Sequence, residues 1–224
     1  MIETAQRVLA VDLSMVPATR TVQFVVGWTR AAFEESRAIA VLTREGLAHA
    51  AAPNRRSFAE LILRLQWLHS VKPDQRAGAL DGMIEEEKGL TRKFYGHLKH
   101  MGYDAQPDLS DMEQVLTDVI QDGRLVDQAK RILAAAKATD GAAIGMYYAW
   151  REETQYMHAT AQLAAAYAPE IEGRLGSGRP PVVDLEFEGH RTATVLAVAL
   201  AYRLLVEEGV DEHTASLLID AFFG

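Results

Sequence analysis

One segment of the chain gathers the side chains best suited to acid–base and phosphate chemistry. It runs from Met146 to His158 and is rich in Tyr, Arg, Thr and His on an Ala- and Leu-rich background. Because each helical residue turns by about 100°, four of its side chains are expected on one face: Tyr147, Arg151, Thr154 and His158. Histidine titrates near neutral pH and serves as a general acid or base. Arginine stabilises charge that develops on a phosphate. The spacing therefore predicts a catalytic stripe.

The pairing of an arginine with a histidine a few residues later is similar to the signature of HEPN proteins, small helical ribonucleases. The chain holds four such pairs: Arg44/His49, Arg64/His69, Arg92/His97 and Arg151/His158. The first three are five residues apart, about 140° around a helix, and only the last is nearly in line. Its Cα atoms would lie about 10 Å apart, gripping a phosphate from two ends. The resemblance implies metal-independent RNA cleavage by a symmetric dimer, in a toxin or phage-defence effector. Tyr147, Tyr148 or Thr154 would orient the phosphate.

Three short motifs resemble a bacterial all-helical family that is catalogued only as a domain of unknown function. They are Thr43-Arg-Glu-Gly46, Arg56-Ser-Phe-Ala-Glu60 with Trp67 downstream, and Tyr147-Tyr148 followed by Thr154 and His158. The resemblance covers roughly residues 30–165. Thr154 stands where the family tends to have serine, so a hydroxyl is kept. The family implies an all-α fold and a site made of Arg56, Glu60, Tyr148, Thr154 and His158. It implies no reaction, and its link to HEPN proteins is our own hypothesis.

A predicted helix over residues 55–71 carries a second polar face, made of Arg56, Glu60, Arg64 and Trp67. One interpretation is a solvated face with ion pairs between positions i and i+4, worth about 0.2–0.5 kcal/mol each. The other is a face packed against another helix to build a site. Trp67 favours the second interpretation, because tryptophan seldom lies on a solvated face without a partner. On that interpretation the ligand-binding residues are Arg56, Glu60, Trp67 and Tyr148.

Three function classes remain open on the sequence. The first is the HEPN-like ribonuclease. The second is a non-catalytic helical binding or interaction protein, with a buried network of Arg56, Glu60, Tyr148 and His158 or a small-ligand pocket. The third is a metalloenzyme or another small-molecule enzyme. The third class lacks motifs, since the chain has no cysteine, no Gly-rich phosphate loop, no H-E-x-x-H, no G-x-S-x-G and no Glu-x-x-His pair. His97 and His100 lack a carboxylate partner at a ligand spacing. We expect no metal and no cofactor.

The elements that must position these residues are all helical. Helical periodicity predicts an all-α, single-domain bundle of about six to eight helices over residues 1–224. It divides into an N-terminal helix and turn (1–17), a core bundle (18–167), a long loop (168–188) serving as a lid or a dimer arm, and C-terminal helices (189–224). Within the bundle we expect one helix each over 125–138 and 142–167, and a glycine-rich helix over 72–101, kinked or split.

Composition limits the partners. The net charge of −8 argues against broad attraction to nucleic acid, although a local basic cleft stays compatible with it. The absence of cysteine fits a reducing cytoplasm. The longest apolar run, 192–206, is interrupted by Arg203 and is too short to span a bilayer. We therefore expect a bacterial cytoplasmic protein and a homodimer, with no membrane association. RNA and a small ligand are the partner classes that remain.

Overall fold

The computed structural model describes residues 1–116, 122–139, 142–176 and 187–224. Over these ranges the protein is all-α except for one two-stranded hairpin, which confirms the predicted fold class. The same ranges contain eleven α-helices, so the prediction of six to eight was wrong. The first elements are α1 (Ile2–Leu9), α2 (Arg20–Arg44), the 3₁₀ turn η1 (Ala48–Ala51), α3 (Ala52–Ser70), α4 (Pro73–His100) and α5 (Ser110–Val115). The later ones are α6 (Gly123–Lys130), α7 (Ile132–Ala138), α8 (Ala142–Met157), α9 (Ala161–Tyr167), β1 (Glu170–Ile171), β2 (Arg174–Leu175), α10 (Phe187–Glu207) and α11 (Glu212–Phe223).

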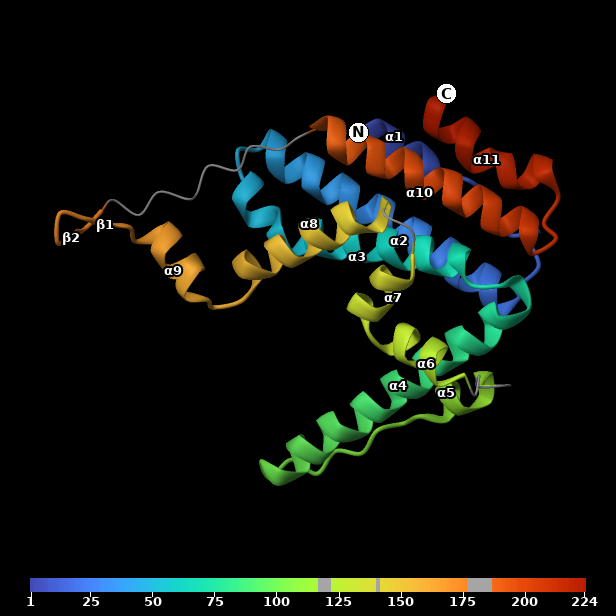
Figure 1. Cartoon of the computed structure of the whole chain (residues 1–224), viewed down its shortest axis with the longest axis horizontal. Helices are drawn as coiled ribbons and strands as arrows, with labels where there is room; N and C mark the ends of the chain where they lie inside the picture. The colour runs from blue at the N-terminus through green and yellow to red at the C-terminus, as the bar shows by residue number, and fades with distance from the viewer. Residues whose placement is uncertain (117–121, 140–141, 177–186) are drawn as a thin grey trace.

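The centre of the molecule is built from α2, α3 and α10, which contact one another in every pairing (Figure 1). Apolar side chains recur every three or four residues along these helices, so each presents an apolar stripe to the other two. Phe58, Ile62 and Leu65 of α3 are 3%, 0% and 0% exposed. Helices α1 and α11 pack together and cover α2 and α10 respectively, while α8 lies along α3. One contiguous core thus connects the N-terminal, central and C-terminal helices.

Helix α4 is a single helix despite its glycines, and it projects away from the central layer (Figure 1). Its first half packs against α2 and α6, where Ala79 and Leu80 are fully buried. Its second half carries exposed apolar side chains, including Leu90 and Phe94.

Two predicted helices are each divided in the structure. The segment 125–138 contains a break at Arg131, whose extended backbone (φ −122°, ψ 117°) separates α6 from α7. The segment 142–167 ends its first helix at Met157. Thr160 then caps α9: it adopts an extended backbone, and its hydroxyl oxygen accepts a hydrogen bond from the Leu163 N–H at 3.1 Å. Threonine satisfies a free N–H at a helix start in this way, and this cap explains the break that periodicity missed.

The predicted loop over 168–188 begins with a short hairpin. Strands β1 and β2 pair antiparallel, with Glu170 opposite Leu175. The two residues of the turn, Glu172 and Gly173, have φ of 51° and 74°, as a two-residue hairpin turn with matching twist requires. Residues 177–186 lie outside the described ranges, and with them most of the predicted lid or dimer arm. No helix within the described part of the chain is both long enough and apolar enough to cross a membrane.

Candidate functional site

The two polar faces singled out by the sequence meet where α8 packs along α3. Arg56 of α3 donates from Nε to the Thr154 hydroxyl oxygen at 3.1 Å. The same guanidinium lies 4.8 Å from the centre of the Trp150 ring, a cation–π geometry, and its Nη1 lies 3.7 Å from the Met157 sulfur. Thr154 in turn donates to the Trp150 carbonyl oxygen at 2.8 Å. The polar groups of Arg56 and Thr154 are thus held by this contact.

Glu60 joins the same contact one turn further along α3. The indole Nε1 of Trp150 donates to its carboxylate at 2.8 Å. The ring of Tyr147 stacks on that of Trp150, with centroids 5.6 Å apart and planes inclined by 26°. Trp150 therefore connects Arg56, Glu60 and Tyr147, and it fixes the direction of the Glu60 carboxylate.

An ion pair closes the contact at the start of α3. Arg55 grips Glu153 with two hydrogen bonds, from Nε at 2.5 Å and from Nη2 at 2.9 Å. Its remaining Nη1 donates to the Ala48 carbonyl oxygen at 2.6 Å. The side chains are 11% and 18% exposed, and a paired fork of this kind is among the stronger charged hydrogen bonds.

The structure separates the predicted catalytic stripe into two groups. Tyr147 and Thr154 are half-buried and face α3. Arg151 is exposed on α8, and His158 is exposed in the bend between α8 and α9, beyond the end of the helix. The in-line arrangement assumed a continuous helix through residue 158, and that assumption was wrong because Thr160 starts a new helix. Tyr148, predicted to bind a ligand, is 69% exposed.

Trp67 does not join Arg56 and Glu60. It is fully buried, and its Nε1 donates to the Gln128 side-chain oxygen at 3.1 Å. Arg64 lies 5.6 Å from the Trp67 ring and donates to the Gln128 carbonyl oxygen at 3.0 Å. Burial lowers the pKa of Arg64, while Glu60 and Glu87 act in the opposite direction. Of the two interpretations of this α3 face, solvated or packed against another helix, the structure supports the second. Helix α8 covers the start of the face, and Gln128 of α6 covers its end.

Spacing pointed to some of the α8 residues that face α3 and missed others. Trp150, Glu153, Thr154 and Met157 lie at positions i, i+3, i+4 and i+7, the spacing of one helix face. That pattern was available from the sequence. It was overlooked because the Arg–His pair drew attention to the neighbouring face, which is exposed.

A groove of about 520 Å³ opens next to Glu60, between α2, α3, α4 and α6. Its charged lining residues are Glu35, Glu60, Arg64, Glu86, Glu87 and Lys130, and Trp28 is its aromatic residue. Asn54 donates from Nδ2 to the Glu35 carboxylate at 2.7 Å, and Lys130 pairs with Glu86 at 3.1 Å. A cavity of this size falls in the range of small-molecule sites.

Comparisons of the chain with protein-family models, with curated proteins and with solved structures give no match. Across the described residues, no three His, Asp or Glu side chains gather in a way that would hold a metal ion.

Proposed function

We propose that the protein is a non-catalytic binding protein that holds a small amine-bearing ligand in the groove beside Glu60. The observation that carries this proposal is the fixed direction of the Glu60 carboxylate. Trp150 Nε1 donates to that carboxylate at 2.8 Å, and Glu60 also lines the groove. A carboxylate fixed by the fold loses little side-chain entropy when it meets a cation, and such preorganisation favours binding.

The charges of the groove favour a cation. Glu35, Glu60, Glu86 and Glu87 line it, against Arg64 and Lys130. Four carboxylates and two cationic side chains give the groove a net charge of minus two. Arg64 is also directed toward the Gln128 carbonyl oxygen, so its guanidinium is already engaged. A ligand with one or two ammonium groups would balance the remaining charge.

Trp28 offers a surface for the same kind of ligand. Its half-buried ring lies in the groove wall and meets Phe24 edge-on, with centroids 5.2 Å apart. An ammonium group over an indole face is attracted by about 0.5–2 kcal/mol. A short diamine therefore finds carboxylates and an aromatic face within one groove.

Titration calorimetry with 1,4-diaminobutane tests the proposal, with 1,4-butanediol as the uncharged analogue. We expect the diamine to bind and the diol not to bind. Glu87→Gln, at an exposed position of the lining, should weaken diamine binding at least tenfold, since a charged hydrogen bond is worth about 1.5–3 kcal/mol. The matched control is Glu152→Gln, which removes the same charge from an exposed position on α8. Equal losses in both variants, or no diamine binding, would refute the proposal.

A metal-independent ribonuclease is the second candidate. It is supported by the exposure of Tyr148 and Arg151 on α8 and of His158 just beyond the end of that helix. Within the described residues, no hydrogen bond or ion pair occupies the side chains of Arg151 and His158. A second copy of the chain would be needed to bring two such pairs together, as the expected homodimer does.

RNA cleavage measured in EDTA tests this candidate. We expect His158→Ala to lower the rate by at least a hundredfold, the usual contribution of a general acid or base. His213→Ala, at an exposed histidine of α11, should leave it unchanged. Cleavage that survives His158→Ala, or that is absent from the wild type, contradicts the ribonuclease.

A further inference from the structure

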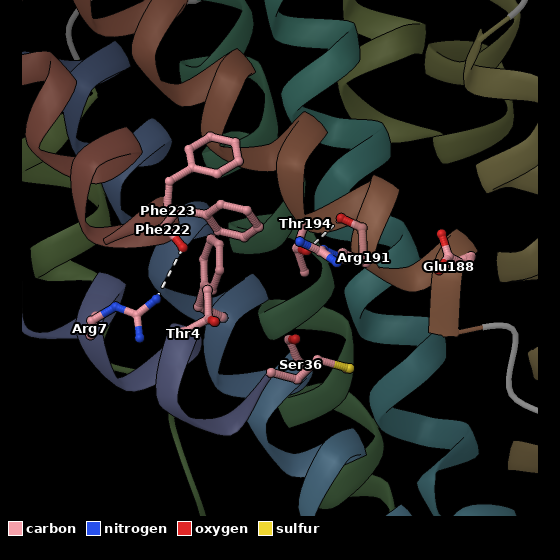
Figure 2. A pocket seen from close by; sticks show the side chains of 10 residues that line it. Thr4, Arg7, Ser36, Glu188, Arg191, Thr194, Phe222 and Phe223 are labelled. Atoms are coloured by element: carbon pink, nitrogen blue, oxygen red, sulfur yellow. Dashed lines mark hydrogen bonds between the residues drawn. The ribbon is translucent and has the colours of Figure 1, made fainter.

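A second cavity, of about 470 Å³, lies where α1, α2, α10 and α11 meet (Figure 2). It is remote in sequence from the α3–α8 contact and shares no residue with the groove beside Glu60. Its lining combines aromatic rings, hydroxyl groups and charged side chains: Met1, Thr4, Arg7, Phe33, Ser36, Glu188, Arg191, Thr194, Phe222 and Phe223.

One wall of this cavity is aromatic. Phe33 and Phe222 are 1% and 7% exposed, and their rings meet edge-on with the ring centroids 6.1 Å apart. The ring of Phe223 packs edge-on against that of Phe222, with the centroids 5.0 Å apart, but Phe223 is 67% exposed. A large apolar side chain left exposed beside a cavity is favourable for an apolar ligand, because the ligand would remove that surface from water.

A buried hydroxyl group lies in the opposing part of the lining. Ser36 of α2 is 2% exposed, and its Oγ lies 2.8 Å from Nε2 of His190 on α10. The His190 ring lies against the Phe58 ring, with the centroids 4.4 Å apart and the planes inclined by 31°. Burial lowers the pKa of His190 to about 4, so the imidazole is neutral at pH 7. When the Nε2–H of His190 donates to Oγ, the Ser36 hydroxyl keeps its own proton and can donate it to an acceptor in the cavity.

The two arginines of the lining differ in the hydrogen bonds and ion pairs that they make within the protein. Arg7 donates to the carbonyl oxygens of Ala221 and Phe222 at 2.9 and 3.2 Å. Arg191 is exposed, and no carboxylate among the described residues lies within ion-pair distance of its guanidinium. Figure 2 shows Arg191 beside Thr194 and above Ser36, across the cavity from Arg7. Two arginines against Glu188 leave the lining with an excess of positive charge.

We propose that this cavity binds a monocarboxylate with an apolar body, such as a medium-chain fatty acid. The carboxylate meets Arg191, in the two-bond geometry that a guanidinium favours, and the Ser36 hydroxyl supplies a further contact. The apolar body lies against Phe222 and the exposed ring of Phe223. The volume is that of a site for a small molecule. This site is independent of the amine-binding groove, because its ligand has the opposite charge and its lining is separate.

Titration calorimetry with octanoate tests the proposal, against octan-1-ol and octylammonium, which share the apolar body. We expect octanoate to bind at least tenfold more tightly than either. Equal binding of octanoate and octan-1-ol would show that the cavity recognises only the apolar body and would overturn the proposal. Preferred binding of octylammonium would do the same.

Substitutions locate the site. Arg191→Gln should weaken octanoate binding at least tenfold while leaving the binding of octan-1-ol unchanged. The control is Arg203→Gln, an exposed arginine on the same helix that is not part of the cavity lining. Ser36→Ala should weaken octanoate binding by a smaller factor, and a thermal melt shows whether this buried substitution still folds. Because Arg191 is exposed, its variant decides the proposal on its own: unchanged octanoate affinity in Arg191→Gln overturns it.

Discussion

His190 couples the fold to pH through its burial. Its pKa is lowered from 6.5 to about 4 chiefly because burial disfavours the charged imidazolium, with a further contribution from the positive amino terminus. Between these two values the unfolded chain binds a proton that the folded protein does not. The free energy of unfolding therefore decreases as the pH falls below 6.5, and the loss is complete below about pH 4.

The expected loss from this one residue is roughly 3 kcal/mol, from about 1.4 kcal/mol per pH unit. Urea unfolding at pH 7 and at pH 4.5 measures it. His190→Gln should reduce the difference in stability between the two pH values, whatever it does to stability at pH 7. His213→Gln, at an exposed histidine, should leave the difference as in the wild type. The same pH dependence in all three proteins would show that His190 does not carry it.

Some residues of the α3–α8 contact could be predicted from the sequence, and others could not. The spacing of polar residues predicted that a polar face of α3 meets one of α8, and the structure brings Arg56 Nε within 3.1 Å of the Thr154 hydroxyl oxygen. It did not identify Trp150, because a tryptophan in a helix is usually part of a core. The bond from its indole N–H to Glu60 depends on the distance between two helices, and that distance is set by packing rather than by local sequence.

The glycines of α4 permit a prediction for the element as a whole. Gly96 is exposed in the helix interior, and a Cβ added there would meet nothing within 4 Å. Gly96→Ala should stabilise the projecting half of α4 by about 0.5–1 kcal/mol, because alanine loses less backbone entropy in a helix. Gly102, just past the end of the helix, has a φ of 88°, so Gly102→Ala should be destabilising.

Hydrogen exchange of the α4 amides measures both effects, since it reports local opening of one element. Protection should increase in Gly96→Ala and decrease in Gly102→Ala. A change in the same direction for both variants would contradict this account of the helix.

At the level of elements, the long periodic helices were predictable and their interruptions were not. The apolar stripes of α2, α3 and α10 are evident from spacing, because burial demands them. The breaks at Arg131 and Thr160 interrupt segments rich in helix-forming alanine, where local propensity favours continuation. The Thr160 hydroxyl stabilises its break by accepting from the Leu163 N–H and donating to the Gln155 carbonyl oxygen. Such local hydrogen bonds are small compared with the helix propensity of the neighbouring residues, so the pattern alone did not reveal the break.

For the whole molecule, an all-α single-domain chain follows from hydrophobic periodicity, and the structure bears this out. The homodimer stays a prediction. Leu90, Phe94 and Met101 follow one another at helical spacing along the projecting end of α4 and are 53%, 57% and 63% exposed. Light scattering at several protein concentrations determines the oligomeric state.

The contact between Arg55 and Glu153 joins residues 98 positions apart, and this separation governs the order in which the molecule can be assembled. A ribosome adding about 5–20 residues per second needs about 5–20 s to pass from one partner to the other. During that interval the start of α3 has been synthesised while α8 has not. Arg55, Arg56 and Glu60 therefore lack their α8 partners during those seconds, and the polar face of α3 keeps the nascent chain from offering a fully apolar helix to other molecules.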